Sequence, residues 1–272
     1  MQKISNSLLL YYPKLTEDIG TTTDNKIVVY ISPTEEIYRQ FVGENFPDWS
    51  DGVASPSRNL IILKSSNILP EHADNSKIAV HELTHILLNQ AVNGNPIPRW
   101  FNEGLAVYYS GEKAFASGTL ISKALVTKSI IGLTDIDDVL TFYSNKAQLA
   151  YQESYLAVSY LFEQYGKEKV KEIISELGKG LPIDQALINI IGMDMLDFEY
   201  EWYQHIKKKY RWRFLVDFDT YLWIFMVALF ILGFILMRLR NKRTIQRWEE
   251  EDKSWNNEWT ASQSPWDADD TD

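Results

Sequence analysis

The residues with the clearest chemical potential form the motif HELTH at positions 81–85. Histidines four positions apart lie on one face of a helix, where both imidazoles can reach the same metal ion. Glu82 lies at the edge of that face, where a carboxylate can take a proton from a metal-bound water. With 4 histidines in 272 residues, a random match to this motif has a probability of about 0.4%. The competing interpretation is a helix that carries two surface histidines, His81 and His85.

A catalytic zinc ion takes three protein ligands and keeps one open position, so the motif needs a third partner. We expect that partner to be Glu103, in the segment RWFNEGLAVY at residues 99–108. It lies 18 positions after His85, and a turn at Asn93-Gly94 would return it beside the histidines in a helical hairpin. The alternative for Glu103 is an ordinary exposed helix acid, as most glutamates are.

These two segments, together with AYQESYLAVSYLFEQYG at residues 150–166, resemble the gluzincin zinc metallopeptidases. The resemblance is to the peptidase MA-like proteins related to aminopeptidase N and thermolysin. It implies that His81, His85 and Glu103 bind one Zn²⁺, and that Glu82 is the general base that activates a metal-bound water for peptide hydrolysis.

The same resemblance, in its aminopeptidase branch, assigns Tyr151 as the hydrogen-bond donor to the oxyanion. The alternative for Tyr151 is a core tyrosine on an amphipathic helix. Ser154 stands where the aminopeptidase pattern has glycine, and no amine-anchoring segment precedes the HELTH helix. Aminopeptidase specificity is therefore not expected.

The elements that must position these residues begin with a small β/α layer. Residues 26–31 (KIVVYI) and 59–63 (NLIIL) predict strands, a helix is expected at 34–43, and 52–57 are expected to form a loop. The later helices are expected at residues 74–92, 98–110, 120–130, 147–164, 167–177, 183–190 and 194–210. The fold class is α+β, a small N-terminal layer followed by a helical gluzincin-like catalytic domain.

A separate segment, residues 220–237, contains 18 positions without a charge. As a helix it would be about 27 Å long, which is enough to cross a lipid bilayer. A buried core helix is the alternative. The chain is therefore expected to comprise a metallopeptidase domain at 1–213, a single transmembrane helix at 220–237 and an acidic tail at 238–272.

The basic residues that flank this helix favour a cytoplasmic C-terminus and an extracytoplasmic catalytic domain, because the closer cluster lies downstream. That orientation requires an upstream targeting segment, since the apolar run at residues 8–12 is too short for a signal peptide. A catalytic domain that faces the cytosol is the alternative.

Charge and composition exclude other classes. Between residues 249 and 272, nine acids and one base contribute −8 of the formal net charge of −10. This acidic balance argues against a nucleic-acid-binding protein, because phosphate contacts need clustered Lys and Arg. The absence of cysteine excludes disulfides, thiolate ligands and a cysteine nucleophile.

The acidic tail contains tryptophans that make it a candidate docking site for a basic protein partner, although a solvated tail is the more common case. For the whole chain we expect a membrane-anchored zinc peptidase that acts on peptides or proteins. The alternative is a catalytically silent, peptidase-like binding module tethered to the membrane. The tail tryptophans are Trp248, Trp255, Trp259 and Trp266.

Overall fold

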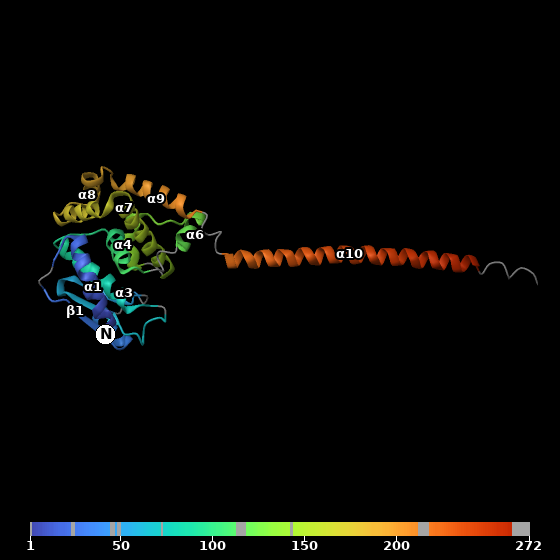
Figure 1. Ribbon diagram of the computed structural model, residues 1–272, viewed down its shortest axis with the longest axis horizontal. Helices are drawn as coiled ribbons and strands as arrows, with labels where there is room; N and C mark the ends of the chain where they lie inside the picture. The colour runs from blue at the N-terminus through green and yellow to red at the C-terminus, as the bar shows by residue number, and fades with distance from the viewer. Residues whose placement is uncertain are drawn as a thin grey trace, which may run out of the picture. The chain divides into compact units, whose positions relative to one another are not determined.

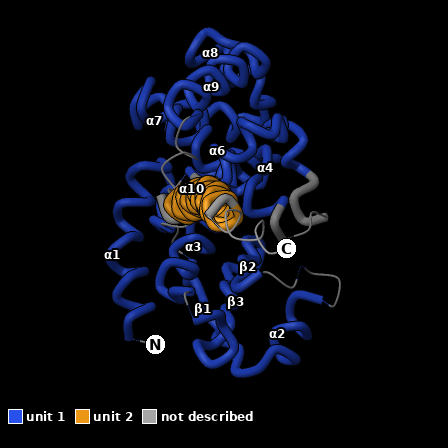
Figure 2. Tube along the Cα trace, turned by 90° about the vertical axis from the view of Figure 1, so that its right-hand side faces the viewer, with its two compact units in different colours: residues 1–214 blue, residues 215–272 orange. Residues whose placement is uncertain are grey.

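The computed structural model describes residues 2–22, 25–43, 47, 50–71, 73–112, 118–141, 144–211 and 218–262. The first part of the chain is mostly helical and carries one three-stranded sheet, and a long helix follows it (Figure 1). The chain divides into two units, residues 1–214 and 215–272 (Figure 2). The expectation of an α+β arrangement with a small β layer and a long apolar C-terminal helix agrees with these elements.

The sheet contains β1 (Val28–Ser32), β2 (Gly52–Ser55) and β3 (Leu60–Lys64) in the order β1-β3-β2. The strand β1 is parallel to β3, whereas β2 is antiparallel to it. The helix α2 (Glu35–Val42) lies between β1 and β2 in the chain and is capped by Thr34, whose hydroxyl accepts the N–H of Ile37. The two predicted strands and this helix are present with small shifts at their ends.

The expected loop at residues 52–57 is wrong, because Gly52–Ser55 form the edge strand β2. A short 3₁₀ turn, η1 (Pro56–Arg58), connects β2 to β3. Asn59 closes this turn with φ 48°, a left-handed conformation that asparagine tolerates better than most residues. The tight connection lets β2 fold back and pair with β3.

The first helix, α1 (Gln2–Ile19), has no counterpart among the predicted elements. Pro13 lies inside it, and an internal proline argues against a helix at the sequence level. The helix packs against α3, and its residues Ile4, Leu15 and Ile19 are buried in the core. Tertiary packing therefore supplies the stability that the local sequence does not indicate.

The rest of the first unit is helical, as expected from residue 74 onward. The predicted stop at Gly166 is confirmed, because Gly166 has the non-helical angles φ 78° and ψ 169° and divides α7 into two helical segments. The 3₁₀ segment η2 was not predicted. These elements are α3 (Asn75–Ala91), α4 (Arg99–Ser110), α6 (Thr119–Thr127), η2 (Leu133–Thr141), α7 (Ser144–Gly178), α8 (Ile183–Ile191) and α9 (Met195–Tyr210).

The helix α4 packs against both α3 and α7. The predicted turn between α3 and α4 is confirmed, with Asn93 and Gly94 at φ 55° and 74°. On its other side α4 approaches α7 so closely that a Cβ on Gly104 would lie 2.4 Å from the carbonyl oxygen of Ser154. Glycine is therefore required at position 104 for this packing.

Two buried polar side chains of α7 hold the segment around α6. The Gln152 side-chain oxygen accepts the N–H of Ile121 at 2.7 Å, and the Glu153 carboxylate accepts the N–H of Ile131 at 3.1 Å. Neither Gln152 nor Glu153 is exposed to solvent. Burial raises the pKa of Glu153 well above its ordinary value, although the Ile131 N–H opposes the shift.

Replacing Glu153 by glutamine is expected to stabilise the chain above neutral pH, because the amide keeps an acceptor oxygen and carries no charge. A carboxyl whose pKa rises on folding contributes fully to stability below its unfolded pKa, near 4.5, and this contribution is lost as the pH rises. The melting temperature of the full chain in detergent should be close to the parent value at pH 5 and roughly 2–5 °C above it at pH 8.5.

The matched control is Gln152→Glu, which adds a carboxylate at the equally buried neighbouring position. Its melting temperature should fall below that of the parent as the pH rises, the reverse of Glu153→Gln. Identical pH profiles for the parent and Glu153→Gln would contradict a raised pKa at Glu153.

The second unit is the helix α10 (Phe218–Ser262), which contains the expected span at residues 220–237. Its apolar side chains are exposed rather than packed within the unit. By length and composition α10 is a candidate for a single membrane span. The helix continues well into the predicted tail, and residues 263–272 lie outside the described part.

Candidate metal centre

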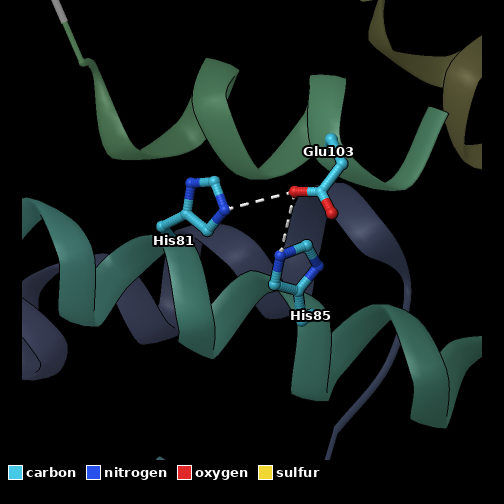
Figure 3. Close-up of side chains that lie close together, drawn as sticks. All are labelled: His81, His85 and Glu103. Atoms are coloured by element: carbon cyan, nitrogen blue, oxygen red, sulfur yellow. Dashed lines mark ion pairs between the residues drawn. The ribbon is translucent and has the colours of Figure 1, made fainter. Parts of the chain in front are cut away.

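Three side chains from α3 and α4 converge on one point in the first unit. Figure 3 shows His81 and His85, one turn apart on α3, facing Glu103 on α4. The Nε2 atoms of His81 and His85 lie 3.4 Å and 3.5 Å from the same carboxylate atom, Oε2 of Glu103. One ligand atom from each residue lies within 4.8 Å of the other two, so the group has the spacing to hold a metal ion.

The local sequence explains why the histidines face α4. An apolar stripe lies on the other side of α3, where Ala79, Leu83 and Ile86 are buried. That stripe packs into the core, which turns the opposite face, with the two histidines, towards the glutamate. Both imidazoles are largely buried, with side-chain exposures of 12% and 15%, so they are not surface histidines.

The donor set fits a zinc ion. Among the described residues, Oε2 of Glu103 is buried and has no hydrogen-bond partner, whereas its other oxygen, Oε1, accepts from Arg99 Nη1 at 3.2 Å. A buried carboxylate oxygen left without a donor is costly. Two imidazole nitrogens and one carboxylate oxygen are ligands that zinc commonly uses in a catalytic site.

Asn102, the residue before Glu103, fixes the orientation of the His85 ring by a contact at Nδ1. Nδ1 of His85 lies 2.8 Å from Oδ1 of Asn102. Because an amide oxygen only accepts, Nδ1 carries a proton in this contact, and Nε2 is the nitrogen that faces Glu103. Once Nε2 is deprotonated, this is the tautomer that a metal ligand needs.

His81 has a different partner, Glu112, which follows the C-terminal end of α4. Nδ1 of His81 lies 3.2 Å from Oε1 of Glu112, an ion-pair distance without hydrogen-bond alignment. Ser110 donates to the same oxygen at 3.1 Å. Lys77, in the first turn of α3, donates to the Gly111 carbonyl at 2.6 Å and ties this segment to the histidine helix.

Arg99, Asn102 and Glu112 were not assigned roles from the sequence. Asn102 and Arg99 lie in the glutamate motif, and the position of Arg99 four residues before Glu103 could have suggested their contact. Glu112 follows the Gly111 cap, and no spacing rule links it to His81.

The buried charged groups of the centre shift one another's pKa values. Burial lowers the pKa of His81, but Glu103 and Glu112 outweigh this effect and hold it well above its ordinary value. For His85, burial is likewise outweighed by Glu103, and the pKa is raised. In return, the histidines hold the pKa of Glu103 well below its usual range, against the effect of burial. Protons and a metal ion compete for the same two nitrogens.

The two other predicted site residues lie beside this group. Glu82 is buried, and burial raises its pKa despite the opposing charges of His81 and His85. The edge strand β2 passes next to it, since a Cβ on Gly52 would come within 3.2 Å of Glu82 Cγ. The ring of Tyr151, on α7, has its centroid 6.4 Å from that of His81.

The hydroxyl of Tyr151 is protonated at neutral pH. Burial, followed by the negative charges of Glu103 and Glu82, raises its pKa well above the ordinary value of 10. A protonated phenol at this place can donate a hydrogen bond to a developing negative charge.

The arrangement agrees with a comparison against protein families. The family model described as Peptidase MA superfamily matches residues 11–208 of this chain. The matched range contains the sheet and every residue of the centre described above, and it ends before α10. A comparison with curated proteins gave no match.

Proposed function

Because this chain belongs to the Peptidase MA superfamily, we propose that it is a gluzincin-type zinc peptidase anchored to a membrane by α10. The observation that carries the proposal is the convergence of His81, His85 and Glu103 on one point, with Glu82 buried on the same helix. The substrate class is a peptide or protein.

In this proposal His81, His85 and Glu103 hold one zinc ion. When bound, zinc lowers the pKa of water and polarises a peptide carbonyl. Arg99 and Asn102 keep two of the three ligands in place through the contacts described above. Relatedness to aminopeptidase N and thermolysin, inferred from the motifs, is part of the proposal.

Glu82 is the general base. Its carboxylate accepts a proton from the attacking water and passes it to the departing amine. Glu82 lies on the same helix as the two histidines and is buried, which supports this role.

Tyr151 is the oxyanion donor. It comes from α7, which packs against α4 and also contacts the histidine helix, and its ring centroid lies 6.4 Å from that of His81. A bound peptide carbonyl beside the candidate ligands would therefore lie near the phenol. A neutral donor stabilises the negative charge of the tetrahedral intermediate without adding a charge to the resting site.

Glu82→Gln is expected to lower kcat for peptide hydrolysis by roughly 10²–10⁴-fold while zinc remains bound, because the amide cannot accept the proton. Turnover of a broad peptide library and zinc content by elemental analysis would be measured on the full chain. Glu172→Gln is the control, since Glu172 is an exposed acid paired with Lys169 on α7.

The catalytically silent alternative predicts a different result. A parent chain that binds zinc but turns over no peptide in the library would favour a binding module over a peptidase. Equal turnover by the parent and Glu82→Gln would exclude Glu82 as the base.

Tyr151→Phe is expected to lower kcat by about 10–10³-fold with little change in KM, because the hydroxyl acts on the transition state. Zinc affinity should be unchanged. If Tyr151 were only a core tyrosine, removal of its hydroxyl would alter the melting temperature and leave kcat near the parent value.

Glu112→Ala is expected to weaken zinc binding by about 10–100-fold, because His81 loses the carboxylate that orients its ring. Chelator competition at fixed pH measures this constant without reference to activity. Glu112→Gln keeps an acceptor oxygen and should recover part of the loss, and Glu172→Ala should have no effect. Unchanged zinc affinity in Glu112→Ala would show that Glu112 does not support His81.

The anchor in this proposal is the uncharged run at residues 220–237 of α10, a helix that is a candidate membrane span by length and composition. Its orientation, with an extracytoplasmic catalytic domain and a cytoplasmic tail, stays a prediction from the basic residues that flank it.

A further inference from the structure

The C-terminal half of α10 carries a stripe of tryptophan side chains on one face, which the proposed peptidase function does not use. Trp248, Trp255 and Trp259 are 62%, 75% and 61% exposed. Exposed indoles are unusual, because tryptophan side chains bury a large apolar area in most proteins. A stripe of them on one helix indicates a surface that another molecule covers.

The helix geometry aligns these side chains. At 3.6 residues per turn, the 7- and 11-residue intervals from Trp248 place Trp255 and Trp259 within about 40° of each other around the axis. The stripe is about 16 Å long. Ile245 extends it by one turn at 52% exposure. In the sequence Trp266 continues the same spacing, although it lies outside the described residues.

The intervals between these residues follow a heptad pattern. Counting Ile245 as the first core position of a heptad places Trp248, Asp252, Trp255 and Trp259 at successive core positions. A stripe at this spacing matches a second helix packed alongside. The face is therefore shaped for a helical partner rather than for an extended peptide.

The charges around the stripe select the partner. Glu249, Glu251 and Glu258 occupy the positions that flank the core of the heptad, and Asp252 lies within it. In a pair of helices these positions set the choice of partner through ion pairs. A cation opposite Asp252, and basic residues opposite the flanking acids, would match them.

A second copy of the chain does not complement the acidic positions around the tryptophan stripe. Two parallel copies would place Asp252 against Asp252 in the core of the contact, and antiparallel copies would bring the flanking acids together. Each copy also carries nine acids against one base over residues 249–272. Like charges at these positions oppose association.

A lipid surface does not complement the tryptophan stripe and its acidic positions either. Trp248 lies 11 residues beyond Met237, the last residue of the uncharged run, or about 16 Å along a continuous helix. Trp259 lies about 33 Å beyond it. The polar layer on each side of a bilayer is only about 5–8 Å deep, and the acids are repelled by anionic lipid.

We infer that the face formed by Ile245, Trp248, Asp252, Trp255 and Trp259 docks a basic amphipathic helix of a partner protein. The tryptophans receive the apolar side chains of that helix, and its Lys and Arg side chains pair with the acids. Lys and Arg also stack favourably on indole faces. This function is independent of peptide hydrolysis.

The test uses the full chain in phosphatidylcholine nanodiscs. The probe is a fluorescent 21-residue peptide with Leu at the core positions of three heptads and Lys at the flanking positions. Binding is measured by fluorescence anisotropy, with empty nanodiscs subtracted. A peptide of the same composition in scrambled order, and a Leu/Glu peptide of the same pattern, are the probe controls.

The chain variants separate the tryptophan face from simple charge attraction. The first replaces Trp248, Trp255 and Trp259 by serine and keeps every charge. The matched control variant combines Trp255→Asn with Asn257→Trp, which keeps composition and charge but moves one indole about 200° around the helix.

The inference requires saturable binding of the Leu/Lys peptide to the parent. It also requires binding at least about tenfold weaker for both variants, for the scrambled peptide and for the Leu/Glu peptide. Equal binding to the parent and the triple variant would overturn it by showing charge attraction alone. It would also be overturned by a tryptophan-dependent dimer in analytical ultracentrifugation without peptide binding, which would identify a second copy as the occupant.

Discussion

The backbones of α4 and α7 meet where Gly104 lies against the carbonyl oxygen of Ser154. A Cβ at position 104 would lie 2.4 Å from that oxygen, closer than packed atoms can approach. Glu103 precedes this contact on α4, and Tyr151 lies one helical turn before Ser154 on α7. The distance between the candidate ligand and the candidate oxyanion donor is therefore set by a contact between two helix backbones.

The α3–α4 hairpin supplies the other half of the site. Its turn, at Asn93 and Gly94, uses left-handed backbone conformations that return α4 along α3. His81 and His85 then meet Glu103, while Asn102 reaches His85 from the same helix. One short connection thus brings three candidate ligands and one orienting group together.

This arrangement buries several charges at a cost to stability. Glu82 and Glu103 are almost fully buried, next to His81 and His85. Ion pairs in such an environment commonly contribute less than apolar packing of the same volume. In the proposed zinc site, a divalent cation would replace the protons that the two histidines otherwise bind beside these carboxylates. The burial of these charges therefore supports the proposal of a metal site more than a role in stabilising the fold.

The sequence determined the features that depend on neighbouring residues. The interval from His81 to His85 places both rings on one helix face, and a run of 18 uncharged residues gives a span of sufficient length, whatever surrounds them. The turn at Asn93-Gly94 and the α2 cap at Thr34 are equally local. The Asn-Gly pair alone predicts the turn.

Only the tertiary structure decided which distant segments meet. The helix α1 forms despite Pro13 because α3 covers its apolar face, and β2 forms because β3 offers hydrogen bonds to a segment that looks like a loop. Glu112 reaches His81 because Lys77 holds the end of α4 against the start of α3. Such contacts depend on the packing free energy summed over the whole unit. They therefore cannot be predicted from the spacing of residues within a short segment of the sequence.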